Sequence, residues 1–220
     1  MARTDIVLVG ARGLAKELLG YLEDDPRFRV VCVLDETPGL SLPGYEVISP
    51  MDWTGGCHKA LFSVGYPEYK RDVLERYAKF GFEWQTYIHP QAVVSRYAQI
   101  GAGCIFAPFT VVAGNAEMGD FVFMNVYSAV GHDSKIGQFS SLMPYACADG
   151  YVALGEECLV ATGAKILPKI SIGDRSRVSA GSIVMRNMPE DSLIYGNPAK
   201  HQPDVAMLRL KKKMRESGNA

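Results

Sequence analysis

A hydrophobic residue recurs at every sixth position through the middle of the chain. The sixteen residues in this register are Val94, Ile100, Phe106, Val112, Met118, Met124, Val130, Ile136, Leu142, Ala148, Leu154, Val160, Ile166, Ile172, Val178 and Val184. The position four residues later is small in most repeats, with Val122, Val152 and Ile170 as exceptions. A six-residue period fits neither a helix nor an alternating strand and is typical of a parallel β-helix. We therefore predict about five stacked coils of three short faces each, in which the recurring residues form the core.

The first 84 residues lack this period and alternate short apolar runs with segments of helical spacing. The apolar runs 5–9, 28–34 and 60–64 end at glycine or acidic residues, and helical spacing follows the first and the third run. This alternation predicts a small Rossmann-like α/β unit with a parallel sheet. Ligands of such sheets bind beyond the carboxyl ends of the strands. The residues expected to bind a substrate there are Gly10, Arg12, Gly13, Asp35, Glu36 and Gly65.

The glycine-rich turn after the first run departs from the fingerprint of dinucleotide-binding proteins. Arg12 occupies the place of the second glycine of that fingerprint, and Ala15 occupies the place of the third. The Arg12 side chain would block the close approach of a nicotinamide dinucleotide, but its guanidinium suits a phosphate group. The turn therefore disfavours an NAD-dependent oxidoreductase. Purely structural roles for Gly10, Gly13 and Asp35 are the alternative.

Composition narrows the function classes further. The formal net charge of −1 argues against nucleic acid or an anionic membrane surface as the main partner. No apolar run approaches the length of a membrane span, and the N-terminus lacks the pattern of a secretory signal peptide. Cys104 and Cys158 fall on the small inward position of the repeat, so we expect reduced thiols in the core. These features predict a soluble cytoplasmic protein.

One of the four histidines, His132, lies inside the repeat, and Asp133 follows it. His132 comes two residues after the inward Val130, so its side chain should point outward near a corner of the coil. An imidazole beside a carboxylate can be held in one tautomer, which suits a general base. A solvated surface histidine is the alternative. A zinc site of the carbonic anhydrase type needs three histidine ligands, so we expect no metal.

These motifs, together with the segment Gly196–Lys200 (GNPAK), resemble the bacterial sugar O- and N-acyltransferases that contain hexapeptide repeats. That family includes sialic acid O-acetyltransferases and N-acetyltransferases of nucleotide-linked 4-amino-4,6-dideoxy sugars. The resemblance extends to about residue 200. It implies a left-handed β-helix, a homotrimer, acetyl-CoA bound between neighbouring β-helices, and a nucleotide sugar that reaches in from the N-terminal unit.

The resemblance also implies roles for single residues. His132 would be the general base, Asp133 its partner, and Asn125 a third residue of the same site. The backbone N–H of Gly150 would face the thioester oxygen, and Ser141 stands where some relatives have a second histidine. The residues implied as contacts of acyl-CoA are Gly150, Ser141, Gly163, Ala180 and Lys200.

We predict three parts of the chain: a Rossmann-like unit at residues 1–84, a β-helix at 85–190, and a tail at 191–220 with a basic helix over 205–216. The predicted function is acyl-CoA-dependent N-acylation, most simply acetylation, of a nucleotide-linked amino sugar. A sugar O-acetyltransferase of the sialic acid type and a non-catalytic β-helix scaffold are the alternatives. Outward aromatic residues such as Phe121, Phe123 and Tyr127 are expected at a three-fold interface.

Overall fold

The computed structural model describes residues 3–204 and divides the chain into two compact units. The first unit comprises Met1–Gly65 and Tyr69–Tyr87, and the second comprises Tyr66–Glu68 and Ile88–Ala220. The main division, at Tyr87, falls a few residues after the boundary expected at residue 84. Within residues 3–204, none of the helices is long and apolar enough to cross a membrane. The predicted basic helix over 205–216 lies outside the described residues.

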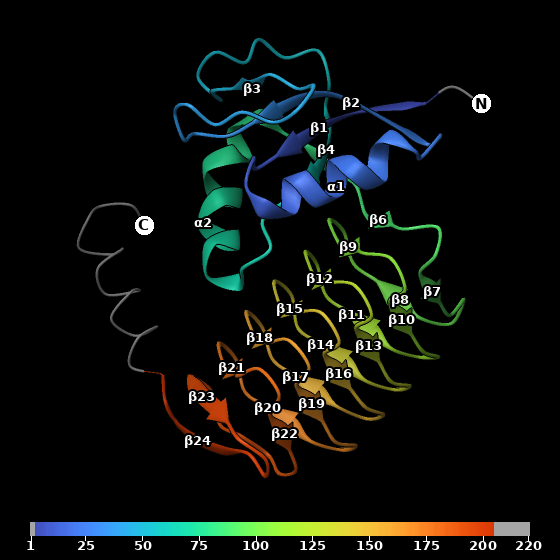
Figure 1. Ribbon diagram of the computed structural model, residues 1–220, viewed down its shortest axis with the longest axis vertical. Helices are drawn as coiled ribbons and strands as arrows, with labels where there is room; N and C mark the ends of the chain where they lie inside the picture. Colours follow the sequence, from blue (N-terminus) through green and yellow to red (C-terminus); the bar gives the residue numbers. More distant parts are fainter. Residues whose placement is uncertain (1–2, 205–220) are drawn as a thin grey trace. The chain divides into compact units, whose positions relative to one another are not determined.

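The first unit contains the parallel sheet that the sequence predicts, with strand order β3-β2-β1-β4-β5 (Figure 1). Its elements are β1 (Thr4–Val9), α1 (Gly13–Glu23), β2 (Phe28–Leu34), β3 (Val47–Ile48), β4 (Lys59–Phe62), α2 (Pro67–Tyr77), the 3-10 turn η1 (Ala78–Phe80) and β5 (Glu83–Trp84). The helix α1 buries four residues on one face, Ala15, Leu18, Leu19 and Leu22, which is the spacing of an amphipathic helix. The strand order reverses between β1 and β4, so a crevice for a ligand is expected at their carboxyl ends.

The second unit is the parallel β-helix that the six-residue period predicts, and its short strands form three sheets. Face 1 contains β7 (Val93–Val94), β10 (Val111–Val112), β13 (Ala129–Val130), β16 (Cys147–Ala148), β19 (Lys165–Ile166) and β22 (Ile183–Val184). Face 2 contains β8 (Gln99–Ile100), β11 (Glu117–Met118), β14 (Lys135–Ile136), β17 (Ala153–Leu154) and β20 (Ser171–Ile172). Face 3 contains β6 (Tyr87–Ile88), β9 (Ile105–Phe106), β12 (Phe123–Met124), β15 (Ser141–Leu142), β18 (Leu159–Val160), β21 (Arg177–Val178), β23 (Ser192–Tyr195) and β24 (Lys200–Pro203). Paired residues are eighteen positions apart, as for Val112 between Val94 and Val130. Each coil therefore repeats the one before it.

The recurring apolar residues of the repeat form one continuous core. Phe106, Met124, Leu142 and Val160 follow one another inside face 3, and all four are fully buried. Cys104 and Cys158 are buried in the same core, as their place in the repeat predicts. Burial raises the pKa of Cys158 to about 12, so this thiol stays protonated at neutral pH.

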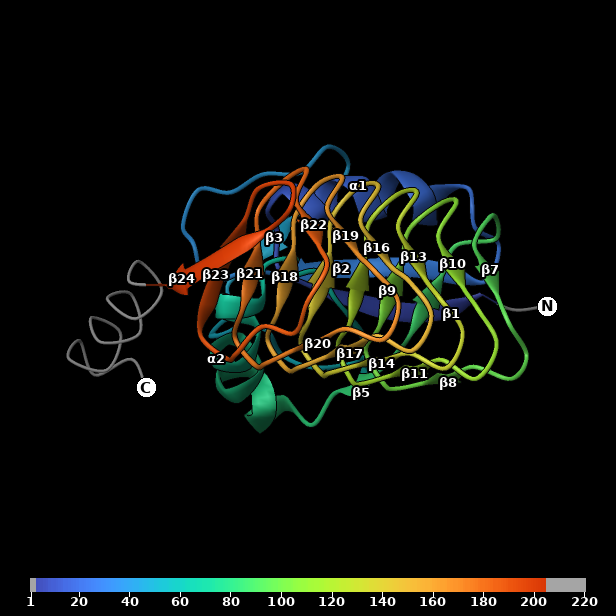
Figure 2. The ribbon, with the colours of Figure 1, turned by 90° about the horizontal axis from the view of Figure 1, so that it is seen from below.

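The corners between the faces line up from one coil to the next, as Figure 2 shows. One residue at most corners has a positive φ angle, a conformation that only glycine and, less readily, asparagine and aspartate adopt at low energy. Between faces 1 and 2 these residues are Asn115, Asp133, Tyr151 and Lys169; between faces 3 and 1 they are Phe109, Tyr127, Tyr145, Gly163 and Gly181. We call the first the His132 corner and the second the Asn125 corner.

The end of the chain differs from the sequence-based prediction. The segment after residue 191 was expected to be a tail and a helix, but β23 continues face 3 in parallel and β24 turns back on it in antiparallel register. These strands lie outside the six-residue period, so the hydrophobic pattern gave no signal for them. Ile194 is nevertheless fully buried in the core of the β-helix.

Candidate active site

His132 and Asp133 lie side by side at the His132 corner, directly after β13. The Nδ1 atom of His132 is 2.7 Å from Oδ2 of Asp133, and 60% of the His132 side chain is exposed. A carboxylate only accepts hydrogen bonds, so Nδ1 must donate and carry the proton. In neutral imidazole, Nε2 then holds a lone pair, which is the form that a general base requires.

The Asp133 carboxylate is anchored from the preceding coil. Asn115 donates a hydrogen bond from Nδ2 to Oδ1 of Asp133 over 3.2 Å. Hydrogen bonds from His132, first, and from Asn115 lower the pKa of Asp133 below its usual value of 3.8. The carboxylate is therefore ionised throughout the physiological range and keeps the His132 ring in one orientation.

Two glycines stand one coil before and one coil after His132. A Cβ atom on Gly150 would lie 2.8 Å from Nε2 of His132, whereas a Cβ atom on Gly114 would meet nothing closer than Oγ of Ser95 at 3.8 Å. Only a glycine at position 150 therefore lets the imidazole lie against the next coil. Within residues 3–204 the backbone N–H of Gly150 has no hydrogen-bond acceptor, although the adjacent Tyr151 donates its N–H to His132 O over 2.9 Å. A lone pair and an N–H donor thus lie close together on an exposed corner.

The other residues predicted for this site lie elsewhere on the β-helix. Asn125 follows β12, and its Oδ1 accepts a hydrogen bond from the backbone N–H of Val126 over 2.7 Å. The predicted acyl-CoA contacts Gly163 and Ala180 share the Asn125 corner, Ser141 is buried in β15, and Lys200 is exposed in β24. Within one chain, His132 and Gly150 therefore lie at one end of face 1 and Asn125, Gly163 and Ala180 at the other, whereas Ser141 and Lys200 lie on face 3. Their contacts with acyl-CoA stay predictions.

In the first unit, the ends of three strands are tied together by hydrogen bonds. Asp35 accepts the N–H of Ala11 at Oδ2 and the N–H of Thr37 at Oδ1, both over 2.8 Å. The Ser63 hydroxyl lies 2.7 Å from the carbonyl oxygens of both Val9 and Gly10, and its single proton is shared between these two acceptors. Both Asp35 oxygens thus hold the backbone, which favours the structural alternative for this residue. A contact between Asp35 and a nucleotide stays a prediction.

Gly10 is the residue that this arrangement requires to be a glycine. Its φ angle is +101°, and a Cβ atom there would lie 3.0 Å from Oγ and 3.2 Å from O of Ser63. Gly13, the first residue of α1, differs, because no atom lies within 4 Å of its Cβ position. Space is therefore open over the start of α1.

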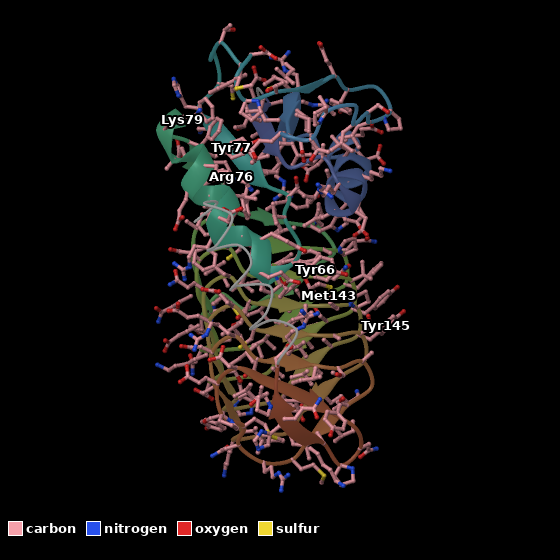
Figure 3. The ribbon with its side chains drawn as sticks, turned by 90° about the vertical axis from the view of Figure 1, so that its left-hand side faces the viewer. Tyr66, Arg76, Tyr77, Lys79, Met143 and Tyr145 are labelled. Atoms are coloured by element: carbon pink, nitrogen blue, oxygen red, sulfur yellow. The ribbon has the colours of Figure 1, made fainter. Side chains whose placement is uncertain are left out.

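The remaining predicted substrate-binding residues are Arg12, Glu36 and Gly65. Arg12 Nη2 donates to Oγ1 of Thr37 over 3.1 Å, and Glu36 forms an ion pair of 2.6 Å with Arg76. Arg76 and Tyr77 lie at the end of α2 (Figure 3). Burial, followed by the charges of Glu36 and Asp35, raises the pKa of Tyr77. Gly65 follows β4 and is half-buried.

Comparison with known proteins identifies the family. No family model matches the chain. The GDP-perosamine N-acetyltransferase of Escherichia coli O157:H7 is 30% identical over 181 residues, which make up 79% of this chain and 82% of that protein. The chain belongs to the sugar N-acetyltransferases with hexapeptide repeats. This match confirms the family that the sequence motifs suggested.

Solved structures extend the likeness to nearly the whole acetyltransferase. PerB from Caulobacter crescentus, in complex with CoA and GDP-perosamine, has a TM-score of 0.84 at 27% identity and covers 90% of this chain and 97% of its own. The acetyltransferase domain of PglB from Neisseria gonorrhoeae, in complex with acetyl coenzyme A, has a TM-score of 0.81 at 27% identity and covers 91% of this chain and 100% of its own.

Among residues 3–204, no three His, Cys, Asp or Glu side chains gather in a way that could hold a metal ion.

Two residues of the site were missed in the sequence. Asn115 and Tyr151 stand eighteen residues before and after Asp133, in the same corner position of neighbouring coils. The spacing alone contained this signal, because every residue of the repeat lies beside those eighteen positions away. The sequence-based interpretation followed the period for the core, but not for the neighbours of Asp133.

Proposed function

We propose that this acetyltransferase transfers an acetyl group from acetyl-CoA to the 4-amino group of a GDP-linked 4-amino-4,6-dideoxy sugar. The observation that carries the proposal is the exposed Nε2 lone pair of His132 beside the N–H of Gly150. The acceptor class is supported by the relatives, since the Escherichia coli protein is a GDP-perosamine N-acetyltransferase and PerB was solved with GDP-perosamine.

The chemistry follows from these two groups. The sugar amine attacks the thioester carbonyl, so a C–N bond forms as the C=O π electrons move to oxygen. The Gly150 N–H can donate to this oxyanion, and Nε2 of His132 takes the proton that the attacking nitrogen loses. Collapse breaks the C–S bond, and the proton passes from His132 to the thiolate. The Asp133 carboxylate stabilises the imidazolium between the two proton transfers.

The first unit supplies a site of the right charge for the nucleotide diphosphate. The helix α1 begins at Gly13, and its first backbone N–H groups lack partners within the helix. Helix N-termini bind phosphate groups through such N–H groups and the helix dipole. Arg12 adds a guanidinium at the same turn. We assign the diphosphate to this position.

The outer surfaces of the β-helix support a homotrimer. The outward residues at the start of face 1 are apolar and exposed, with Val93 at 63% and Val111 at 41%, whereas face 2 presents the ion pair of Lys135 with Glu117 at 2.9 Å. The Asn125 corner adds three exposed, stacked rings, Phe109, Tyr127 and Tyr145, the last of which lies at the edge of the coils in Figure 3. Exposed apolar surface of this kind favours burial against another copy in a closed ring.

One of the three aromatic residues expected at the interface needs correction. Phe123 lies on face 3 and is only 4% exposed within the single chain, so the expectation for this residue was wrong. Phe121 stacks on Phe139 at a ring distance of 5.6 Å, at the corner between faces 2 and 3. The period identified the outward positions, but it did not distinguish covered faces from open ones.

A homotrimer also accounts for the division of the predicted site between two corners. If the His132 corner of one copy faces the Asn125 corner of the next, His132 and Gly150 meet the Asn125, Gly163 and Ala180 of a neighbour. One groove then contains the base, the oxyanion donor, and Gly163 and Ala180 of the predicted acyl-CoA contacts. A single chain has these groups at opposite ends of face 1.

The acceptor is tested by measuring CoA thiol release with a panel of GDP-, UDP- and dTDP-linked 4-amino-4,6-dideoxy sugars and with free sialic acid. We expect the highest kcat/KM with a GDP-linked amino sugar, and mass spectrometry should locate the acetyl group on nitrogen. A clearly higher kcat/KM with sialic acid, or acetylation of oxygen, would instead establish the O-acetyltransferase alternative.

The shared site is tested by complementation. Chains with His132→Ala and chains with Asn125→Ala should each be nearly inactive, and co-expression should restore activity because mixed trimers contain some grooves with both native residues. Light scattering should give about three times the 24.1 kDa of one chain. A monomer, or mixed assemblies without recovered activity, would contradict the shared groove.

A further inference from the structure

We propose that Asn115 and Tyr151 are positioning residues that act through Asp133 to hold the His132 ring. They stand in the same corner position as Asp133, one coil before and one coil after it. The inference rests on the proposed role of His132 as the base. It adds that the base is oriented by a column of three side chains from three coils.

Asn115 fixes one oxygen of the carboxylate. Its Nδ2 donates to Oδ1 of Asp133 over 3.2 Å, which leaves Oδ2 for the 2.7 Å hydrogen bond with His132. The backbone supports the same geometry, because Asp133 donates its N–H to the carbonyl oxygen of Gly114 over 3.0 Å. Asn115 has a φ of 58°, and asparagine is among the few residues that tolerate this conformation.

Tyr151 contacts His132 from the following coil. Its ring stands edge-on to the His132 ring, with centroids 5.1 Å apart and an angle of 86° between the planes. The pKa of the Asp133 carboxyl is lowered first by His132, then by Asn115, and also by Tyr151. Tyr151 has a φ of 60°, a backbone conformation that is unfavourable for a tyrosine.

At the Asn125 corner, the corresponding column consists of aromatic side chains and contains no carboxylate between them. Tyr127 and Tyr145 stack in parallel, with ring centroids 5.0 Å apart and 3° between the planes. Tyr151 does not stack on the residue before it, since its neighbours are Asp133 and His132, and its ring meets the imidazole at a right angle.

The contacts matter because the pair is exposed. With 60% of the His132 side chain and 34% of the Asp133 side chain open to solvent, little packing restricts their rotamers. The hydrogen bond from Asn115 and the ring of Tyr151, on the two neighbouring coils, supply that restriction, and a base out of line by about 1 Å can lose much of its rate.

The test uses Asn115→Gly, which keeps the positive φ and removes the amide, and Tyr151→Phe, which keeps the ring and removes the hydroxyl. Each should lower kcat about tenfold and leave the KM for acetyl-CoA unchanged. In an Asp133→Ala background neither change should lower kcat further, because both residues act through the carboxylate. The matched controls are Glu157→Gly, at a residue of positive φ in another corner, and Tyr195→Phe. Both variants should keep native kcat.

The outcomes separate this inference from the proposed function. An unchanged kcat in Asn115→Gly and Tyr151→Phe, or an equal loss with and without Asp133, would overturn the positioning role while His132→Ala still lowers kcat. If His132→Ala itself keeps native kcat, the proposed function is wrong. Thermal melting of each variant shows that folding is retained, and Tyr151→His, which keeps an aromatic donor, should recover part of the rate lost in Tyr151→Phe.

Discussion

The β-helix and the α/β unit hold their candidate functional residues in different ways. In the β-helix, the repeat places the neighbours of the His132–Asp133 pair one coil away: Gly150 lies against His132, and Asn115 donates to Asp133. In the α/β unit, Asp35 and Ser63 reach a turn that is 24 and about 53 residues distant in the chain, and each contact occurs once.

This difference separates two kinds of effect. In the β-helix the backbone is fixed by the stacked coils, so a substitution changes the orientation of a reacting group and should alter kcat. In the α/β unit the hydrogen bonds of Asp35 and Ser63 shape the turn itself, so a substitution should alter the affinity for the nucleotide sugar. The following predictions test that separation.

The largest effect is expected for His132→Ala. Loss of a general base should lower kcat by about two to four orders of magnitude. The KM for acetyl-CoA should stay the same, because the imidazole acts on the proton of the acceptor amine. Steady-state kinetics with both substrates measure this, and a kcat within about twofold of native would remove His132 from the mechanism.

A smaller effect is expected for Gly150→Ala. The added Cβ atom would lie 2.8 Å from Nε2 of His132, so the ring must move out of line. We expect kcat to fall about ten- to a hundredfold. Gly114→Ala, one coil before His132, is the control, because its Cβ atom would make an ordinary contact at 3.8 Å. Equal kcat values for the two variants would show that the repeat does not position the base.

Asp35→Asn tests the α/β unit. The amide has one acceptor oxygen, so it cannot accept both the Ala11 and the Thr37 N–H groups that the carboxylate accepts. Loss of one such hydrogen bond in this half-buried turn costs about 1 kcal/mol, which corresponds to roughly a fivefold increase in KM for the nucleotide sugar. The KM for acetyl-CoA and kcat should not change. Asp52→Asn, in an exposed loop, is the control, and a loss in kcat alone would contradict the separation.

The same difference explains what the sequence could predict. The period predicts the core and the outward direction of His132, because each depends only on position within a coil, whereas the role of Gly150 was implied by the family resemblance. It does not predict that Phe123 is buried, because the period alone does not distinguish buried from exposed outward positions. It does not predict that β23 and β24 continue face 3 either, because these strands lie outside the repeat. In the α/β unit, the turn at Gly10 followed from the strand pattern. The role of Asp35 did not, since a carboxylate at a strand end can bind a ligand or the backbone equally well.

The smallest effect is expected in the pKa of Asp133, which the donors of the column lower. A lowered pKa means that the charged carboxylate is fully present above its usual value of 3.8 and is lost only as the pH falls through the lowered value. Removing a donor should move this pKa upward, so the anchor of His132 is lost at a higher pH. The order of contributions predicts the largest upward movement in His132→Ala, a smaller one in Asn115→Gly and the smallest in Tyr151→Phe. Carbon-13 NMR of labelled aspartate carboxyl groups, titrated with acid, measures all three. If the pKa of Asp133 stays in place in Asn115→Gly, the two coils are not coupled through this carboxylate.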